Sequence, residues 1–184
     1  DGLLYRWTGS AWRVQGNWST TTTLGSSAAS ITISSIPTYL KNLRITWTLR
    51  SDLAATVGQF LYMRVNADAS TNYRWAINQN VGGAVSGSVG NATTQMLIGV
   101  VPGASALANC FASGTIDFAG WNSPHATYLG QTFASQYMQD TSNYWTITGG
   151  GHWSQAGPYT SIILFPASAS NFVAGSSITV TGSE

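Results

Sequence analysis

The chain has 184 residues and a formal net charge of only +1, from seven Lys and Arg against six Asp and Glu. Two of the carboxylates lie at the chain ends, so few acid/base side chains remain in the interior of the sequence. Most hydrolytic mechanisms would need several of them in one active site, which argues against a hydrolase. The remaining acid/base residues are Asp52, Asp68, Asp117, Asp140, His125 and His152. The near-neutral charge also argues against the basic clusters of nucleic-acid-binding proteins, and a lone cysteine excludes an internal disulfide.

The first eighteen residues predict a small aromatic hairpin, LLYRW and AWRVQ, with a turn at residues 8–10. Because an isolated hairpin is marginal in water, we expect Trp7, Trp12 and Trp18 to pack on the main domain or on another chain. The polar tract at 19–27 predicts a linker to a larger unit at 28–184.

Residues 1–20 show neither a basic nor an apolar signal-peptide region, and no apolar run is long enough to span a membrane. The sequence therefore predicts no membrane insertion. The start at Asp1 indicates a trimmed chain or the downstream part of a longer polypeptide.

From Ala28 onward the pattern is one of short strands. SITISSI at 30–36 alternates apolar and polar residues and stops at Pro37, which cannot donate to a sheet ladder. The segment 40–52 predicts a long half-buried strand, with its apolar side chains on one face: Leu43, Ile45, Trp47 and Leu49. At its end, Arg50 and Asp52 are consistent with an internal salt bridge that pins the following loop.

Strands are also predicted at 59–66 and 72–80, whereas the Gly/Ser/Ala stretch at 81–94 predicts a long mobile loop. Six later candidates are QMLIGVV, FASGTIDFAGW, ATYLGQTFAS, NYWTITGG, YTSIILFPA and SSITVTG. No segment shows sustained helical periodicity, with one turn within 103–109 as the expected exception. Roughly ten short strands with turns between them predict an all-β antiparallel sandwich, and the mixture of tight turns and long crossings favours a jelly-roll-like arrangement.

Two segments carry the residues that chemistry would use. Asn66, Asp68, Ser70 and Asn72 place oxygen atoms at every second position, as a calcium loop does. The glycine and the acid that a helix-loop-helix site requires are replaced by Thr71 and Ile77, so a β-turn capped by Asx-type hydrogen bonds is the favoured interpretation.

The second segment places His152 and Trp153 behind three glycines. Such glycines bring backbone close to a ligand, or they allow a bend in a sheet. Without a lysine after the glycines or a following helix, a nucleotide site is excluded. No cofactor is implied.

Four stretches resemble a known family: ITISSIPTYLKNLRITWTLRSD at 31–52, LYMRVNADASTNYRW at 61–75, IGVVPGASALANCFASGTIDFAGW at 98–121 and GGGHWSQAGPYTSIILFPASASNFVAGSSITVTG at 149–182. They resemble the jelly-roll or β-sandwich C-terminal domains of tailed-phage virion structural proteins, including tail-fibre and minor tail proteins. The chain departs from that pattern at Val65 and Ala67, where Phe and Gly are usual, and at its end, 181–184. DGLLYRWTGSAW resembles short hairpins that join such domains to upstream virion parts.

The resemblance implies a virion location, with other virion proteins and further copies of the chain as partners, a homotrimer being the expected assembly. It transfers no catalytic residue. The expected function is a non-catalytic structural domain of a tail or head appendage that also binds a host-surface glycan, because aromatic, amide and hydroxyl side chains suit sugars. The candidate binding residues are Trp121, His125, Tyr128, His152 and Trp153.

Two alternatives stay open. One is a carbohydrate-binding module of a secreted enzyme, which would share the sandwich and the aromatics. The other is a polysaccharide depolymerase or esterase, in which at least two of the six acid/base groups would converge in one cleft.

Overall fold

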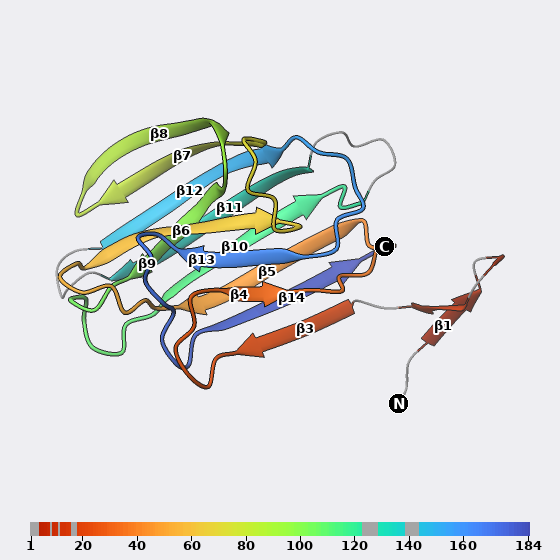
Figure 1. Ribbon diagram of the computed structural model, residues 1–184, viewed down its shortest axis with the longest axis horizontal. Coiled ribbons are helices and arrows are strands. Elements are labelled where there is room, and N and C mark those ends of the chain that lie inside the picture. Colours follow the sequence, from red (N-terminus) through yellow and green to blue (C-terminus); the bar gives the residue numbers. More distant parts are fainter. Residues whose placement is uncertain (1–3, 8, 11, 16–17, 123–128, 139–143) are drawn as a thin grey trace.

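The computed structural model describes residues 4–7, 9–10, 12–15, 18–122, 129–138 and 144–184 (Figure 1). These residues form antiparallel β-sheets packed as a sandwich, which confirms the predicted fold class. No helix in this described part is long and apolar enough to cross a membrane.

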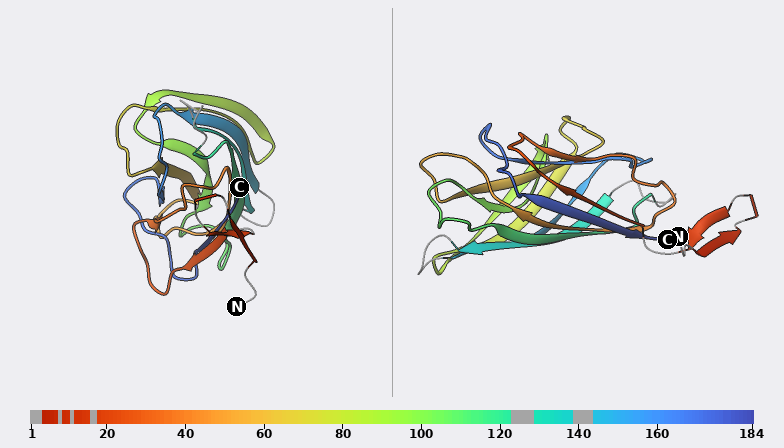
Figure 2. Two further views of the ribbon diagram at one scale, coloured as in Figure 1. Left: turned by 90° about the vertical axis from the view of Figure 1, so that its right-hand side faces the viewer. Right: turned by 90° about the horizontal axis from the view of Figure 1, so that it is seen from below.

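The two main sheets lie face to face (Figure 2). The larger sheet contains, in spatial order, β3 (Trp18–Thr23), β14 (Ser177–Ser183), β5 (Asn42–Leu49), β10 (Ala112–Ala119), β11 (Leu129–Met138), β12 (Tyr144–Trp153), β7 (Tyr73–Val81) and β8 (Ala84–Thr93). The smaller sheet contains β4 (Ile31–Ile33), β13 (Ile162–Pro166), β6 (Gly58–Val65) and β9 (Met96–Pro102). A separate hairpin joins β1 (Leu4–Trp7) to β2 (Trp12–Gln15).

The strand pairing is nested, as in a long hairpin that has been rolled up. β3 pairs with β14, β4 with β13, β5 with β10 and β6 with β9, and successive pairs alternate between the two sheets. This is the connectivity of a jelly roll. Two additional hairpins, β7–β8 and β11–β12, widen the larger sheet beyond β10.

The core lies between the two sheets, and the apolar face of β5 faces it. Leu43, Ile45, Trp47 and Leu49 are buried, whereas Arg44 and Thr48 are exposed on the opposite face. Complete burial of one such aliphatic side chain contributes about 1.5–3 kcal/mol to folding. Alternation in β5 therefore correctly predicted both the strand and its buried face.

Two segments predicted without strands are strands at the edges of the larger sheet. β3 covers the last residue of the predicted hairpin element and the first five of the predicted linker, and it pairs with β14, in keeping with the strand preference of its β-branched threonines. The predicted loop at 81–94 contains β8, which pairs with β7 through the two-residue turn Gly82-Gly83. Both glycines have positive φ, at 56° and 91°, the backbone that a tight hairpin turn requires.

The loop after β9 is held by Arg50 rather than by a helical turn. Residues 103–109 form turns without a helix. The Arg50 guanidinium donates to five carbonyl oxygens of this loop, the shortest bonds being 2.6 Å to Leu107 and 2.9 Å to Cys110. The predicted Arg50–Asp52 pairing was wrong, because Asp52 instead accepts hydrogen bonds from the backbone and side chain of Asn171, at 2.8 and 2.9 Å.

The N-terminal hairpin extends away from the sandwich (Figure 1). Trp7 and Trp12 contact each other with ring centroids 5.5 Å apart and are 50% and 68% exposed. Trp18 instead packs against the core. Packing on the main domain is therefore confirmed for Trp18, whereas packing of Trp7 and Trp12 on another chain stays a prediction.

Candidate binding site

Trp121 and Trp153 are core residues. Trp121 is 0% exposed and Trp153 3%, so the prediction that their rings serve as surface platforms for sugars was wrong. A continuous row of rings runs through the interior, with centroids 5.3–6.2 Å apart: Phe118, Trp121, Tyr159, Trp153 and Tyr73. Of the other predicted binding residues, His125 and Tyr128 lie outside the described residues, and His152 is half-buried on β12.

In the candidate calcium loop, the side chains of Asn66 and Asp68 are engaged in hydrogen bonds within the loop and with other parts of the protein. Asp68 accepts from the Ser70 backbone at 2.8 Å, from the Asn72 amide at 2.8 Å and from the Trp153 indole at 2.6 Å. Asn66 accepts from the backbone N–H groups of Thr160 and Ser161 and donates to the Pro158 carbonyl. The Asp68–Ser70 bond is the Asx-type cap that the sequence favoured over a metal loop.

The Asp68 carboxylate gives the loop a specific pH dependence. Partial burial favours the neutral form, but the bonds from Asn72, Ser70 and Trp153 outweigh it and lower the pKa of Asp68 from 3.8 to about 2. Since the folded-state pKa is depressed, the stabilisation is present above about pH 4 and is lost as the pH falls toward 2.

We expect Asp68→Asn to show a smaller loss of unfolding free energy between pH 5 and pH 2 than the unmodified chain. Urea denaturation at a series of pH values measures this. Asn72→Ala, which removes one donor but keeps the carboxylate, should fall between the two. An acid dependence identical in all three proteins would show that Asp68 does not contribute.

An open hollow of about 450 Å³ lies on the outward face of β12, β7 and β8. Arg74 and His152 are direct cross-strand partners on this face, and Ala76 is partnered by Gly150 on one side and Val89 on the other. Asn91 completes the lining. The hollow therefore combines an arginine, an imidazole and an amide over a floor that includes glycine and alanine.

Glycine in β12 is required for this geometry. A Cβ atom on Gly151 would overlap the carbonyl oxygen of Arg74 and crowd the backbone of Trp75. Only glycine lets β12 and β7 approach this closely. The glycines at 149–151 were expected to bring backbone close to a ligand or to allow a bend, and at Gly151 the close neighbour is the backbone of strand β7.

Arg74 differs from the other described cations in its surroundings. Lys41 donates to the Asn122 carbonyl, Arg64 donates to the Thr94 carbonyl, and Arg50 is bound to its loop. Arg74 is exposed and forms no hydrogen bond or ion pair within the part of the chain that the structure describes. None of the described residues accepts from its guanidinium, whose donors suit a carboxylate or hydroxyl oxygen of a ligand.

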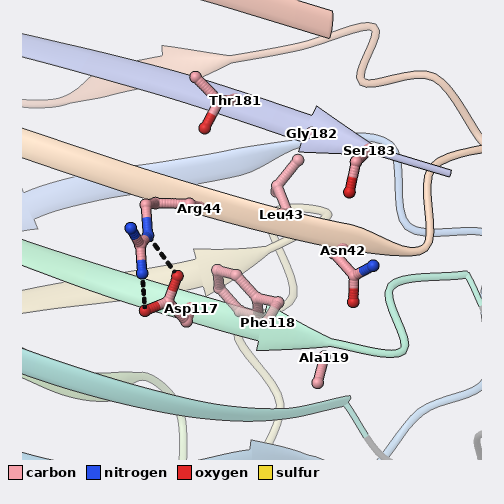
Figure 3. Close-up of a pocket in the computed structure, with 9 residues that line it drawn as sticks. All are labelled: Asn42, Leu43, Arg44, Asp117, Phe118, Ala119, Thr181, Gly182 and Ser183. Carbon is pink, nitrogen blue, oxygen red and sulfur yellow. Dashed lines mark hydrogen bonds and ion pairs between the residues drawn. The ribbon is translucent and has the colours of Figure 1, made fainter. Parts of the chain in front are cut away.

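A second hollow, of about 250 Å³, lies on the same sheet around Arg44 (Figure 3). Here Arg44 and Asp117 form a two-pronged ion pair, with Nε–Oδ1 at 2.6 Å and Nη2–Oδ2 at 2.9 Å. The hydrogen bond and charge of Asp117 raise the pKa of Arg44. Because the two charges neutralise each other, this hollow offers a ligand less net attraction than the one at Arg74.

The described acid/base groups occupy separate places. Asp52 follows β5 and binds Asn171, Asp68 lies in the turn before β7, and Asp117 projects from β10 toward Arg44. Asp140, like His125, lies outside the described residues. Within the described ranges no three His, Cys, Asp or Glu side chains are grouped closely enough to hold a metal ion.

Sequence reasoning identified His152 but missed Arg74. The signal available was the alternation of 72–80, which places Arg74 and Ala76 on the face opposite Tyr73 and Ile77. The pairing of β7 with β12, which brings Arg74 and His152 together, is not visible in one sequence. No family model, curated protein or solved structure matches the chain significantly.

Proposed function

We propose that the chain is a non-catalytic domain of a tailed-phage appendage that binds a host-surface glycan in the Arg74 hollow. The observation that carries the binding role is the Arg74 guanidinium, which has no hydrogen-bond partner among the described residues, beside His152 in a concave surface. The virion setting rests on the family resemblance of residues 31–182. Copies of the chain and other virion proteins would be its assembly partners.

The hollow suits a saccharide in size and chemistry. Its volume of about 450 Å³ falls in the usual range for small-ligand sites. Arg74 and Asn91 supply donors for hydroxyl or carboxylate oxygens, while Ala76 and Val89 provide apolar contact for a ring. Because Arg74 has no partner in the described part of the chain, its guanidinium favours acidic sugars, whose carboxylate accepts two parallel hydrogen bonds from an arginine.

The placement of the carboxylates supports binding over hydrolysis. Retaining and inverting glycosidases require two carboxyl groups roughly 5–9.5 Å apart across the scissile bond. Asp52 and Asp117 are each engaged in separate structural contacts, and none of the described carboxylates lines the Arg74 hollow.

Arg74→Gln should weaken glycan binding at least about tenfold, because a lost charge-assisted hydrogen bond costs roughly 1.5–3 kcal/mol and 1.4 kcal/mol is a factor of ten. A glycan array that includes uronic and other acidic sugars selects the ligand, and calorimetry then compares affinities. Arg44→Gln is the matched control, since Arg44 is exposed on the same sheet but already paired.

Equal weakening by the two substitutions would contradict the assignment to the Arg74 hollow. An array without any bound glycan would contradict the binding function itself. Antibody labelling of phage particles, viewed by electron microscopy, tests the virion setting separately.

A further inference from the structure

The sandwich has four sheet edges, and β8 differs from the other three. Exposed edges invite pairing with another chain, so proteins protect them by shortness, charge, bulges or cover. β4 has only three residues, and every residue of β9 is buried. β3 has six residues, Trp18 and five hydroxyl-bearing side chains, and its tryptophan packs against the core.

β8 has ten residues and lacks most of these protections. Residues 84–89 are all exposed, and the chain has no Asp, Glu, Lys, Arg or His between Arg74 and Asp117. The register shift against β7 lies at Tyr73/Trp75, opposite the far end of β8, so the stretch 84–89 is regular. β8 contains no proline, and its outer backbone N–H and C=O groups face away from β7.

β8 also exposes two apolar side chains on one of its faces. Val85 is 74% exposed and Val89 67%, the two most exposed aliphatic side chains among the large hydrophobic residues described. They are four residues apart and therefore lie on the same face of the strand, with Gly87 midway between them.

We propose that β8 pairs in antiparallel register with β8 of a second copy of this chain, about a two-fold axis at Gly87. In this register Val85 of each copy lies opposite Val89 of the other, so both exposed valines gain a cross-strand partner. The free backbone groups of both edges are satisfied at the same time, and the two larger sheets join into one. The pairing is isologous and closes as a dimer.

This assembly replaces the trimer expected from the family resemblance. It does not rest on the proposed glycan function, although Val89 also lines the Arg74 hollow. Light scattering in the absence of any sugar therefore tests it separately. We expect a mass of twice 19.5 kDa for the purified chain at micromolar concentration. A monomer or a trimer would overturn the proposal.

Val85→Lys should convert the dimer to a monomer, because it places two lysines at the shared edge, where charge opposes strand pairing. Val57→Lys is the matched control: Val57 is exposed, at 39%, but lies outside β8. We expect its mass to remain that of the dimer. A dimer that survives Val85→Lys, with circular dichroism unchanged, would exclude this edge.

Cysteine cross-linking tests the register. In a Cys110→Ala background, Gly87→Cys should form an intermolecular disulfide, since directly opposed residues have Cα atoms about 4.5–5.5 Å apart. A Cβ at Gly87 meets no atom nearer than the Ile77 carbonyl oxygen at 3.4 Å, so β8 tolerates the change. Val85→Cys should not cross-link, because four residues of offset separate its two copies by roughly 13 Å. Cross-linking of Val85→Cys, or its absence in Gly87→Cys, would overturn the Gly87-centred register.

Discussion

Replacing Trp121 with alanine should lower the free energy of unfolding by about 3–5 kcal/mol, the usual cost of truncating a buried aromatic side chain. Trp121 is fully buried and lies between Phe118 and Tyr159, with ring centroids 5.3 and 5.4 Å away. Truncation therefore opens a cavity in the row of rings that connects β10 to the segment before β13. Urea denaturation followed by circular dichroism measures the change.

Two further substitutions separate packing from hydrogen bonding. The Trp121 indole Nε1 has no hydrogen-bond partner within the described residues, so Trp121→Phe should cost less than half as much as Trp121→Ala. Trp12→Ala, on the exposed hairpin, should change the unfolding free energy by no more than about 0.5 kcal/mol. Similar losses for Trp121→Ala and Trp12→Ala would show that the row of rings does not stabilise the core.

The second large effect is expected at Arg50. Arg50→Met keeps the length and much of the apolar stem but removes the donors for five carbonyl oxygens, and should cost about 2–3 kcal/mol. The carbonyls belong to the loop at 103–110, which contains turns rather than helix. Hydrogen exchange should therefore accelerate most in this loop, while chemical denaturation reports the overall loss.

Arg64→Met is the matched control. Arg64 donates to the Thr94 carbonyl and the Gln95 side chain and lies over the Phe165 ring, a smaller set of contacts. We expect a loss of about 1 kcal/mol. If Arg50→Met cost no more than Arg64→Met, the carbonyl contacts of Arg50 would not stabilise the loop.

Strand prediction succeeded where one face of a strand is buried and the other is exposed. In β5 the alternation of large apolar and polar residues is the direct signature of that environment. β8 has no such signature because its residues 84–89 are exposed on both faces. Its strand structure comes from pairing with β7, a nonlocal cause that Gly and Ser propensities do not reveal.

The site residues were predicted less well than the fold. Trp121 and Trp153 were expected to bind a glycan because aromatic side chains suit sugars, but both are buried against rings from distant parts of the chain, Trp121 against Tyr159 and Trp153 against Tyr73. Long-range packing of this kind has no periodic trace in one sequence. The roles of Asp68 and Asn72, by contrast, followed from local spacing, and the Asx-type turn is present.

The nested pairing of the strands has a consequence for how the chain folds. The outermost pair joins β3, at residues 18–23, to β14, at residues 177–183, so the sheet is completed only after almost the whole domain has emerged from the ribosome. Folds dominated by such distant pairings form slowly, because the chain must lose the entropy of closing long loops before the stabilising contacts can form. The β7–β8 and β11–β12 hairpins instead pair segments that are close in the sequence, which makes the central part of the chain the natural place for folding to start.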